Sequence, residues 1–433
     1  MKADHMTLRP NAVRIAIVGM GYVGLPLALQ FCRSGVSVTG LDIDAAKVDS
    51  INKGTSYIRH IASSEIAQAT AAGHFRATTD FAACRDVSAV LICVPTPLDE
   101  HHEPDISYVL DTGRAIAPHL PRGCIVVLES TTYPGTTDGE LREVLEAGSG
   151  LKAGVDFHLA FSPEREDPGR TSSTVKTIPK VVGGLTPACR DRAVALYGRA
   201  VDRVVPVSSC RVAEATKLLE NIFRSVNIAL VNELKVVYEA MGIDVWEVIE
   251  AAKTKPFGFM AFYPGPGLGG HCIPIDPFYL TWKAREFGQH TRFIELAGEI
   301  NTAMPEHVVR VVSRALNDDS KPVRGSTVML AGLAYKPNVD DERESPAYVI
   351  MKKLESLGAT VLYNDPFVPV IRPTREHPEF AGRRSSPLTT PVDAVVIVTA
   401  HDAYRSFDWA ALPYPVIDSR NAVAVRPLKY YRA

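Results

Sequence analysis

The sequence predicts an α/β protein in which two parallel-sheet domains are joined by a long central helix and a helical region. In the N-terminal half, short apolar runs rich in Val and Ile alternate with helical stretches. The same alternation returns in a smaller unit at the end of the chain. Between the two units, residues 209–241 contain neither Pro nor Gly. Near-continuous apolar strands separated by helices are typical of a parallel sheet that is covered on both faces.

The first sheet begins soon after the N-terminus. Arg14 to Val18 is a β-branched run that leads into glycines, residues 25–33 have the pattern of a helix, and Val36 to Leu41 forms the next strand. Bounded apolar runs predict further strands at 90–94, 125–128 and 180–182.

The central segment has the periodicity of one long helix. Apolar residues recur at helical spacing from Val212 to Val237, and Gly242 ends the pattern. A second helical region is predicted over 291–316, interrupted at Pro305. A long helix between two α/β units often serves as a connector and a subunit interface, so we expect a homodimer or a higher homo-oligomer.

The last unit repeats the strand and helix alternation without a glycine fingerprint. Strands are predicted at 327–330, 360–363, 394–398 and 416–417, with a helix at 347–357 that Gly358 ends. We therefore expect three domains: 1–207 binds a nucleotide, 208–321 is helical and serves dimerisation and catalysis, and 322–433 is a second, smaller α/β domain.

Composition excludes several classes of function. The 433 residues are 46% hydrophobic and 22% charged with a net charge of -2, which favours neither nucleic acid nor an anionic membrane as a partner. No apolar run reaches the length of a membrane span, and Met1 to Asn11 lacks the apolar core of a signal peptide. The seven cysteines are scattered without metal-ligand spacing, so we expect reduced thiols in a cytoplasm and no metal.

A dinucleotide fingerprint follows the first strand. Gly19-Met20-Gly21-Tyr22-Val23-Gly24 matches G-x-G-x-x-G, opens a helix, and is followed by Asp42 at the end of the next strand. In a Rossmann-like domain the glycines admit a pyrophosphate at the helix N-terminus, and the Asp carboxylate accepts hydrogen bonds from ribose hydroxyls, which favours NAD over NADP. The alternative is a glycine turn in an unrelated α/β protein. The expected cofactor contacts are Gly19, Gly21, Tyr22, Val23, Gly24, Asp42, Lys47, Thr96 and Thr131.

A cysteine at the end of a glycine-rich run is the most reactive group that the sequence suggests. Cys272 ends the run 265–272, and Asp276 lies four residues on. Two glycines before it leave the sulfur little side-chain cover, which suits chemistry better than packing. We also expect the glycines to let a bulky ligand approach that sulfur.

Other candidates are weak one by one. Lys217 and Asn221 are four residues apart on the predicted helix, which puts both on one face. Glu164 follows a strand-like run and Ser162-Pro163, and clustered charges occupy 334–337 and 341–346. Taken alone, each of these is usually solvated surface.

Together, these motifs resemble one family, the UDP-glucose and UDP-N-acetylhexosamine 6-dehydrogenases. The resemblance covers nearly the whole chain in order, and 259–280 and 162–169 are most similar to the bacterial UDP-N-acetyl-D-glucosamine 6-dehydrogenases. The matching motifs are Gly19–Gly24, 94–97, 130–136, 162–164, 217–221, 269–276 and 332–346.

The resemblance implies oxidation of a sugar C6 alcohol to a carboxylate for surface-polysaccharide synthesis, with two NAD+ and water consumed. Cys272 would add to the aldehyde as a thiohemiacetal, whose oxidation gives a thioester that water releases. Lys217 and Asn221 would stabilise the alkoxide oxygen. Asp276 and Glu164 would move protons, with their division of labour left open. Thr131 is a further catalytic candidate.

The resemblance also implies binding residues. Arg343 would reach the cofactor. The expected substrate contacts are Glu164, Lys217, Asn221, Phe262, Tyr263, Gly265, Gly267, Gly269, Lys336 and Arg420. Two positions depart from the family: Lys253 to Pro256 lies where UDP-glucose enzymes carry an arginine for the partner subunit, and His271 often has another residue in its place.

Three alternatives remain at this point. The sugar could be UDP-glucose, UDP-N-acetylgalactosamine or UDP-N-acetylmannosamine, since no motif reports an epimeric hydroxyl. A two-electron dehydrogenase of hydroxy acids would share the NAD domain but would need neither Cys272 nor a third domain. A sensor could bind NAD and a UDP-sugar without turnover.

Overall fold

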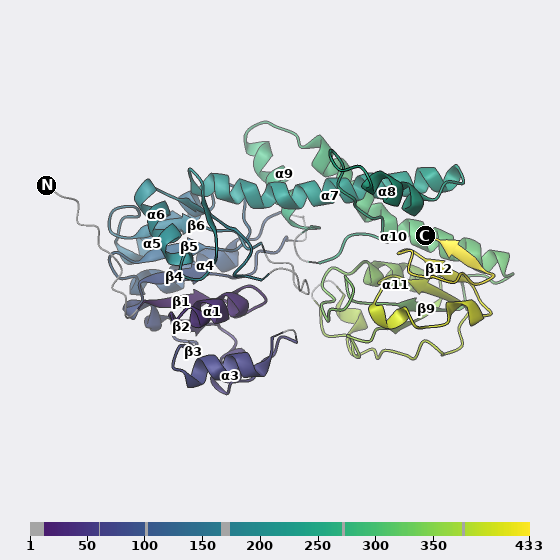
Figure 1. Cartoon of the computed structure of the whole chain (residues 1–433), viewed down its shortest axis with the longest axis horizontal. Coiled ribbons are helices and arrows are strands. Elements are labelled where there is room, and N and C mark those ends of the chain that lie inside the picture. The colour runs from purple at the N-terminus through teal and green to yellow at the C-terminus, as the bar shows by residue number, and fades with distance from the viewer. Residues whose placement is uncertain (1–12, 60, 100–102, 166–173, 271–272, 375–376) are drawn as a thin grey trace. The chain divides into compact units, whose positions relative to one another are not determined.

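The computed structural model describes residues 13–433 except 60, 100–102, 166–173, 271–272 and 375–376. The chain forms two compact units, described here one at a time (Figure 1). The first unit comprises Met1–Glu220 and Phe278–Gly288, and the second comprises Asn221–Pro277 and Gln289–Ala433. The chain passes from the first unit to the second inside the long helix α7 (Cys210–Ala240).

The first unit is built on an eight-stranded sheet with the order β3-β2-β1-β4-β5-β6-β7-β8. Neighbouring strands are parallel except for the pair β6 and β7. The chain order reverses between β1 and β4, which is where open α/β sheets bind ligands at the carboxyl ends of their strands. The strands are β1 (Arg14–Val18), β2 (Ser37–Leu41), β3 (Phe75–Thr78), β4 (Ala89–Ile92), β5 (Ile125–Leu128), β6 (His158–Phe161), β7 (Lys180–Gly184) and β8 (Val204–Pro206).

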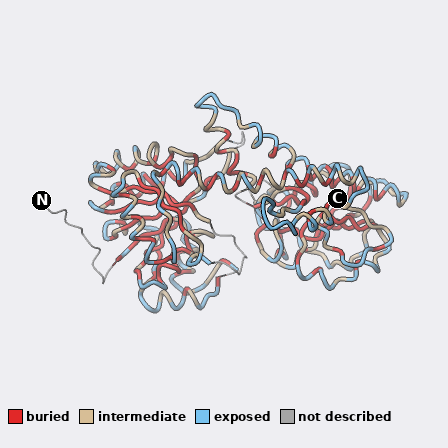
Figure 2. The backbone as a smooth tube through the Cα atoms, turned by 45° about the horizontal axis from the view of Figure 1, so that its top comes forward, coloured by how far each residue is buried: buried red, intermediate tan, exposed pale blue. Residues whose placement is uncertain are grey.

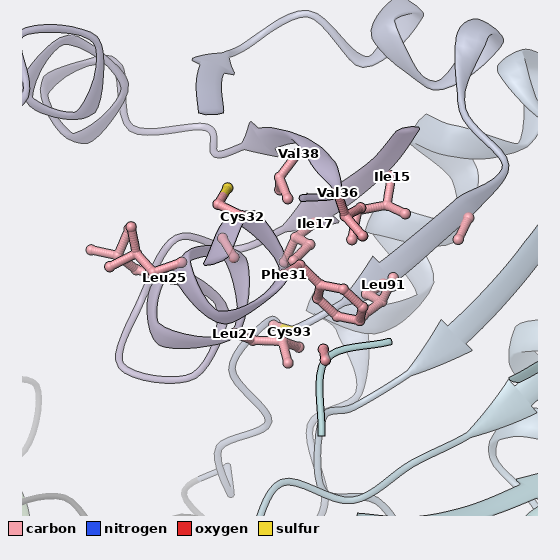
Figure 3. Close-up of a cluster of buried hydrophobic side chains, with 14 of the residues drawn as sticks. Ile15, Ile17, Leu25, Leu27, Phe31, Cys32, Val36, Val38, Leu91 and Cys93 are labelled. Atoms are coloured by element: carbon pink, nitrogen blue, oxygen red, sulfur yellow. The ribbon is translucent and has the colours of Figure 1, made fainter. Parts of the chain in front are cut away.

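Helices cover both faces of this sheet because successive strand residues point to opposite sides. Ile15 and Ile17 pack with Phe31 of α1 in one apolar cluster (Figure 3), whereas Ala16 and Val18 belong to the cluster on the other face. The helices of this unit are α1 (Gly24–Arg33), α2 (Ala45–Asn52), α3 (Ser63–Ala71), α4 (Ser107–Ile116), α5 (Arg142–Ser149) and α6 (Pro187–Tyr197), and most of α9 (Asp276–Glu286) also belongs to it.

The second unit contains a five-stranded sheet with the order β10-β9-β11-β12-β13, in which every neighbouring pair is parallel. Its strands are β9 (Thr327–Ala331), β10 (Thr360–Asn364), β11 (Ala394–Ile397), β12 (Val416–Asp418) and β13 (Tyr430–Arg432). Helix α11 (Pro346–Ser356) packs into the apolar cluster on one face. The predicted α/β class, with two mostly parallel sheets and a long central helix, is therefore confirmed.

One predicted interruption is wrong. Helix α10 is continuous from Arg292 to Asp318 and contains Pro305. Proline removes one backbone hydrogen bond, but Met304, Pro305 and Val308 are all buried. Tertiary packing of that face therefore outweighs the local cost of the proline.

The apolar stripe predicted for α7 exists, but it faces outward in the single chain. The exposed fraction is 42–66% for its members Val212, Leu219, Leu230 and Val237. Figure 2 colours the backbone by burial and shows buried and exposed residues alternating along the chain. The buried positions of α7 are instead largely polar, namely Glu214, Lys217, Asn221, Ser225, Asn232 and Lys235. This inner face supplies much of the candidate site.

The helical region is completed by α8 (Val245–Lys253), whose N-terminus is capped by Asp244 through a hydrogen bond from the Trp246 amide. Among the described residues, no helix combines the length and the apolar character that a membrane span requires.

Candidate active site

Three glycines, Gly19, Gly21 and Gly24, form the turn between β1 and α1, which we call the cradle. Backbone atoms crowd Gly19 and Gly24, whereas the space beside Gly21 is open. Gly19 has a φ of +91°, and a Cβ there would overlap the Cys93 carbonyl oxygen. A Cβ at Gly24 would overlap the Gly19 carbonyl oxygen, whereas a Cβ at Gly21 would meet nothing within 4 Å. Positions 19 and 24 therefore need glycine for the turn itself, and position 21 leaves space beside the N-terminus of α1.

Asp42 lies at the end of β2, beneath this turn. Its Oδ2 accepts a hydrogen bond of 2.8 Å from the Met20 amide, and its Oδ1 accepts one of 2.9 Å from the Asp44 amide. The Lys47 ammonium lies 3.4 Å from Oδ2. Because each carboxylate oxygen can accept about two hydrogen bonds, Asp42 keeps capacity for a ribose hydroxyl.

Thr96 and Thr131 lie beyond the carboxyl ends of the neighbouring strands β4 and β5. Thr96 is buried, and its carbonyl accepts a hydrogen bond of 2.7 Å from the Tyr279 hydroxyl. Thr131 is half-buried, and the adjacent Ser130 hydroxyl donates to the Val94 carbonyl at 2.7 Å. The sheet thus brings both threonines to the edge that carries the glycine turn.

Glu164, just after β6, approaches a buried charge cluster that sequence reasoning missed. Lys180, the first residue of β7, has its ammonium 2.5 Å from Glu129 Oε2 and 3.6 Å from Glu164 Oε2. The Tyr197 hydroxyl donates to the other oxygen of Glu129. The available signal was weak: a Glu directly after an apolar strand and a Lys opening another.

The neighbouring carboxylates keep Lys180, the central residue of this cluster, positively charged. Burial by itself would lower the pKa of the Lys180 ammonium, but attraction to Glu129 and Glu164 raises it above its usual value. Lys180 therefore remains a cation at neutral pH although it is buried. It holds the carboxylate of Glu164 from the sheet side.

Lys217 and Asn221, one turn apart on α7, each donate a hydrogen bond to a residue that carries a carboxylate. The Lys217 ammonium donates to the backbone carbonyl of Glu164, within the first unit. The Asn221 amide donates to Asp276 Oδ2 and its oxygen accepts from Arg224, within the second unit. Lys217, Asn221 and Asp276 are all buried. Cys272, the predicted nucleophile, and His271 lie outside the described residues.

The glycine run before Cys272 packs closely against protein rather than leaving open space. The Gly265 amide donates to Asn232 Oδ1 at 2.9 Å, and a Cβ at Gly265 would overlap the Arg420 guanidinium. A Cβ at Gly269 would lie 2.7 Å from Cβ of Tyr335. Gly267 has a φ of +135°. These glycines are therefore required by the packing and the turns of the run itself.

The expected substrate residues of the second unit have different surroundings. Arg420 meets Gly265 and donates from Nε to the Val398 carbonyl at 2.8 Å, so these two lie together. Phe262 packs edge-on against Phe223, with ring centroids 5.6 Å apart. Tyr263 instead points to α8, where it stacks on Trp246 and donates to Glu250 at 2.6 Å.

Lys336 and Arg343 lie on the connection between β9 and α11. Arg343 is exposed and forms a bidentate pair with Asp341, whereas the Lys336 ammonium lies 5.7 Å from the centre of the Tyr335 ring. A second cluster missed from the sequence anchors this connection. The Asp365 carboxylate accepts from the amides of Leu333 and Ala334 and lies 3.0 Å from His401 Nε2.

Comparison with known proteins decides what this arrangement belongs to. The chain matches the UDP-glucose/GDP-mannose dehydrogenase family in three successive models: the NAD binding domain over 13–201, the central domain over 211–303 and the UDP binding domain over 329–425. The chain belongs to the UDP-glucose/GDP-mannose dehydrogenase family. It is an NAD-dependent UDP-sugar dehydrogenase, an oxidoreductase acting on CH–OH groups.

Individual relatives differ in the sugar that their names give. The UDP-N-acetyl-D-glucosamine 6-dehydrogenase of Pseudomonas aeruginosa is 35% identical over 399 residues, covering 91% of this chain and 92% of that one. A UDP-N-acetyl-D-mannosamine dehydrogenase structure from Pyrococcus horikoshii superposes with a TM-score of 0.88 at 32% identity, covering 97% and 99%. A UDP-glucose dehydrogenase structure from Pyrobaculum islandicum gives 0.87 at 26% identity, covering 98% and 99%.

The residues of the first unit fit the NAD of this dehydrogenase family. The open space at Gly21 lies at a helix N-terminus, which favours a pyrophosphate, and Asp42 offers acceptors to a ribose. A carboxylate at that position also repels a 2′-phosphate, which accounts for NAD over NADP.

Gly21→Ala and Gly19→Ala separate ligand contact from folding. Gly21→Ala should leave the melting temperature nearly unchanged but weaken NADH binding about tenfold or more, because only the ligand space is filled. Gly19→Ala should lower both, since its Cβ meets the backbone at a positive φ. Fluorescence titration with NADH and thermal unfolding measure the two effects. Unchanged NADH affinity in Gly21→Ala would contradict the cradle.

Lys180→Met tests the buried cluster. It leaves Glu129 buried without its cation, so the free energy of unfolding in urea should fall by about 3–5 kcal/mol. The double variant Lys180→Met/Glu129→Gln should recover most of that loss, because the orphaned charge is removed as well. Lys176→Met is the matched control, since Lys176 pairs with Asp202 at an exposed position and should change little. Equal stability of Lys180→Met and wild type would rule out a strongly coupled pair.

Proposed function

We propose that this dehydrogenase oxidises UDP-N-acetyl-D-glucosamine at C6 to UDP-N-acetyl-D-glucosaminuronate, a four-electron reaction that serves surface-polysaccharide synthesis. The observation that carries the proposal is the buried pairing of Asn221 with Asp276, four residues after Cys272. That pairing holds an amide and a carboxylate next to the segment that bears the nucleophile. The sugar is supported by the similarity to the Pseudomonas aeruginosa enzyme, whose name states this substrate.

The chemistry of the chain follows from which groups it can hold in place. NAD+, when bound, accepts a hydride in each of the two oxidations. The Cys272 thiol adds to the C6 aldehyde and forms a C–S bond, giving a thiohemiacetal whose oxidation yields a thioester. Water then breaks the C–S bond, which releases the carboxylate and restores the thiol. Two hydrides and the corresponding protons leave the substrate, so the four electrons balance.

Lys217 and Asn221 suit the stabilisation of the oxygen that gains charge in these steps. One is a buried cation and the other a buried amide donor, and preorganised donors of this kind need no reorganisation during the reaction. Asp276, held by Asn221, is positioned as the proton acceptor of the first oxidation. Glu164, held through its carbonyl by Lys217 and through its carboxylate by Lys180, is positioned to activate water for thioester hydrolysis.

The domains and partners follow the same proposal. The nucleotide-binding domain spans 1–207, the helical domain 208–321 and the UDP-sugar domain 322–433. Lys336, Arg420 and the neighbourhood of Phe262 bind the substrate, and the exposed apolar face of α7 forms a homodimer interface. The exposed Val212, Leu219, Leu230 and Val237 support that interface, since apolar faces of this kind mark association surfaces.

The stoichiometry of NADH release tests the reaction. With UDP-N-acetylglucosamine as the limiting substrate, we expect two NADH for each uronic acid, with the product identified by mass. A panel with UDP-glucose, UDP-N-acetylgalactosamine and UDP-N-acetylmannosamine assigns the sugar. One NADH for each substrate would exclude the four-electron route, and binding without any NADH would favour a sensor.

Cys272→Ala tests the thioester. The variant should form no acid, because no thiohemiacetal can be oxidised, while its NADH affinity stays near that of the wild type. Cys189→Ala is the control, since Cys189 is buried in α6 and has no place in the reaction. Uronic acid formed by Cys272→Ala at a rate close to that of the wild type would contradict the covalent route.

Leu230→Lys tests the interface. A charge on the exposed apolar face should shift the protein toward the monomer in sedimentation at micromolar concentration, because burying it unpaired is costly. Leu428→Lys changes a fully exposed leucine outside α7 and should leave the oligomer in place. A monomeric wild type would remove the proposed interface altogether.

A further inference from the structure

A cavity of about 390 Å³ lies in the second unit, within the size range of small-molecule sites. It is lined by the C-terminal part of α7, the start of α8 and the ends of β12 and β13. None of the residues expected to bind NAD or the UDP-sugar lines it. The polar and aromatic lining residues used below are Lys235, Glu239, Asp244, Trp246, Asp418 and Arg432.

Lys235 brings an unpaired amine into this cavity. The residue is 6% exposed, and its Nζ has no hydrogen-bond partner within the described part of the chain. Burial lowers its pKa to about 7, although Glu239 and Asp418 act to raise it and Arg420 acts to lower it. A buried, unpaired amine is a cost to the folded state, and natural chains keep such costs mainly where a ligand meets them.

Arg432 presents a second unpaired donor to the same cavity. Its Nη2 bonds to Asp244, but its buried Nε has no partner among the described residues. Two positively charged side chains therefore each leave a donor unused. A single acceptor group placed in the cavity could satisfy both.

The carboxylates that line the cavity are already engaged by other groups. Asp244 accepts from the Trp246 amide at 3.1 Å and pairs with Arg432. Glu239 accepts from Arg314 at 2.9 Å and faces His307 at 3.6 Å. Asp418 accepts from the amides of Arg420 and Val423 and from the Tyr430 hydroxyl. The unmet hydrogen-bonding capacity of the cavity is therefore that of donors.

We propose that this cavity binds a small oxyanion, a carboxylate or a phosphate or sulfate group, between the Lys235 ammonium and Arg432 Nε. It is an effector site apart from the NAD cradle and the UDP-sugar residues. Trp246, which also lines the cavity, provides apolar surface for the body of an organic anion. Arg426, which also lines the cavity and stacks on Tyr430, adds a third positive charge.

The proposal has a pH dependence with a defined sign. The anion binds the ammonium form of Lys235, so binding above about pH 7 must take up a proton. Affinity should therefore fall as pH rises from 7, by up to about tenfold for each unit. In the absence of anion, the depressed pKa means that Lys235 destabilises the fold most at low pH. Between about pH 7 and 10 the unfolded chain holds the extra proton, so stability should rise with pH relative to Lys235→Met.

Inorganic sulfate is the probe, because it stays a dianion across this pH range. Full-length protein with saturating NADH and UDP, which occupy the nucleotide sites, is titrated with sodium sulfate by calorimetry and thermal unfolding. Sodium chloride of equal ionic strength corrects for screening, and the variants correct for the general stabilising effect of sulfate. The variants are Lys235→Met, Arg432→Gln and the control Lys352→Met, which changes an exposed lysine paired with Glu379.

We expect wild type and Lys352→Met to bind sulfate with the pH dependence described above. Lys235→Met should bind at least tenfold more weakly at pH 7 with no such dependence, and should be at least as stable as the wild type without sulfate. Arg432→Gln should weaken binding while keeping the pH dependence, since Lys235 remains. Equal affinity and equal pH dependence of wild type and Lys235→Met would overturn the site. The NADH stoichiometry stands or falls separately from these titrations.

Discussion

The polar inner face of α7 is the constraint on which the rest of the molecule depends. A buried polar group needs a hydrogen-bond partner, and several of those on this face take theirs from segments far away in the sequence. Glu214 accepts from the amides of Gly135 and Thr137, Lys217 donates to the Glu164 carbonyl, and Asn221 donates to Asp276. One helix thereby holds Glu164 and Asp276, the two carboxylate residues that we propose as catalytic. Within each unit, the apolar cores provide stability, and these hydrogen bonds fix the positions of the residues that they join.

The same face explains why a helix with a clear apolar stripe can turn that stripe outward. The polar residues are needed inside to hold loops, so the apolar residues are left on the surface of the single chain. Asn232 is an example of a polar residue that is needed inside. Its side chain accepts a hydrogen bond from the Gly265 amide and donates one to Asn301, so it joins the glycine run to α10. Lys235 follows three residues further along α7, and its charged atom has no hydrogen-bond partner among the described residues.

Elements with a strong local pattern were predictable, and long-range pairings were not. The strand at Arg14–Val18, the helix over 210–240 and the fingerprint at Gly19–Gly24 follow from periodicity and glycine spacing, and the structure contains each. Pro305 shows the limit of local rules, because packing of α10 overrode its usual effect. Glu129, Lys180 and Tyr197 come from distant positions, and nothing local to any one of them predicts that they meet.

By itself, the sequence determined the α/β class, the NAD cradle and the types of residue available for chemistry. Those properties depend on neighbours a few positions apart, which periodicity and spacing describe. Only the tertiary structure decided which donor holds which residue that carries a carboxylate. It also decided that Gly265 and Gly269 pack against Arg420 and Tyr335, and that the buried face of α7 is the polar one. Those outcomes depend on the desolvation of groups far apart in the chain, and desolvation is a property of the folded environment rather than of any local pattern.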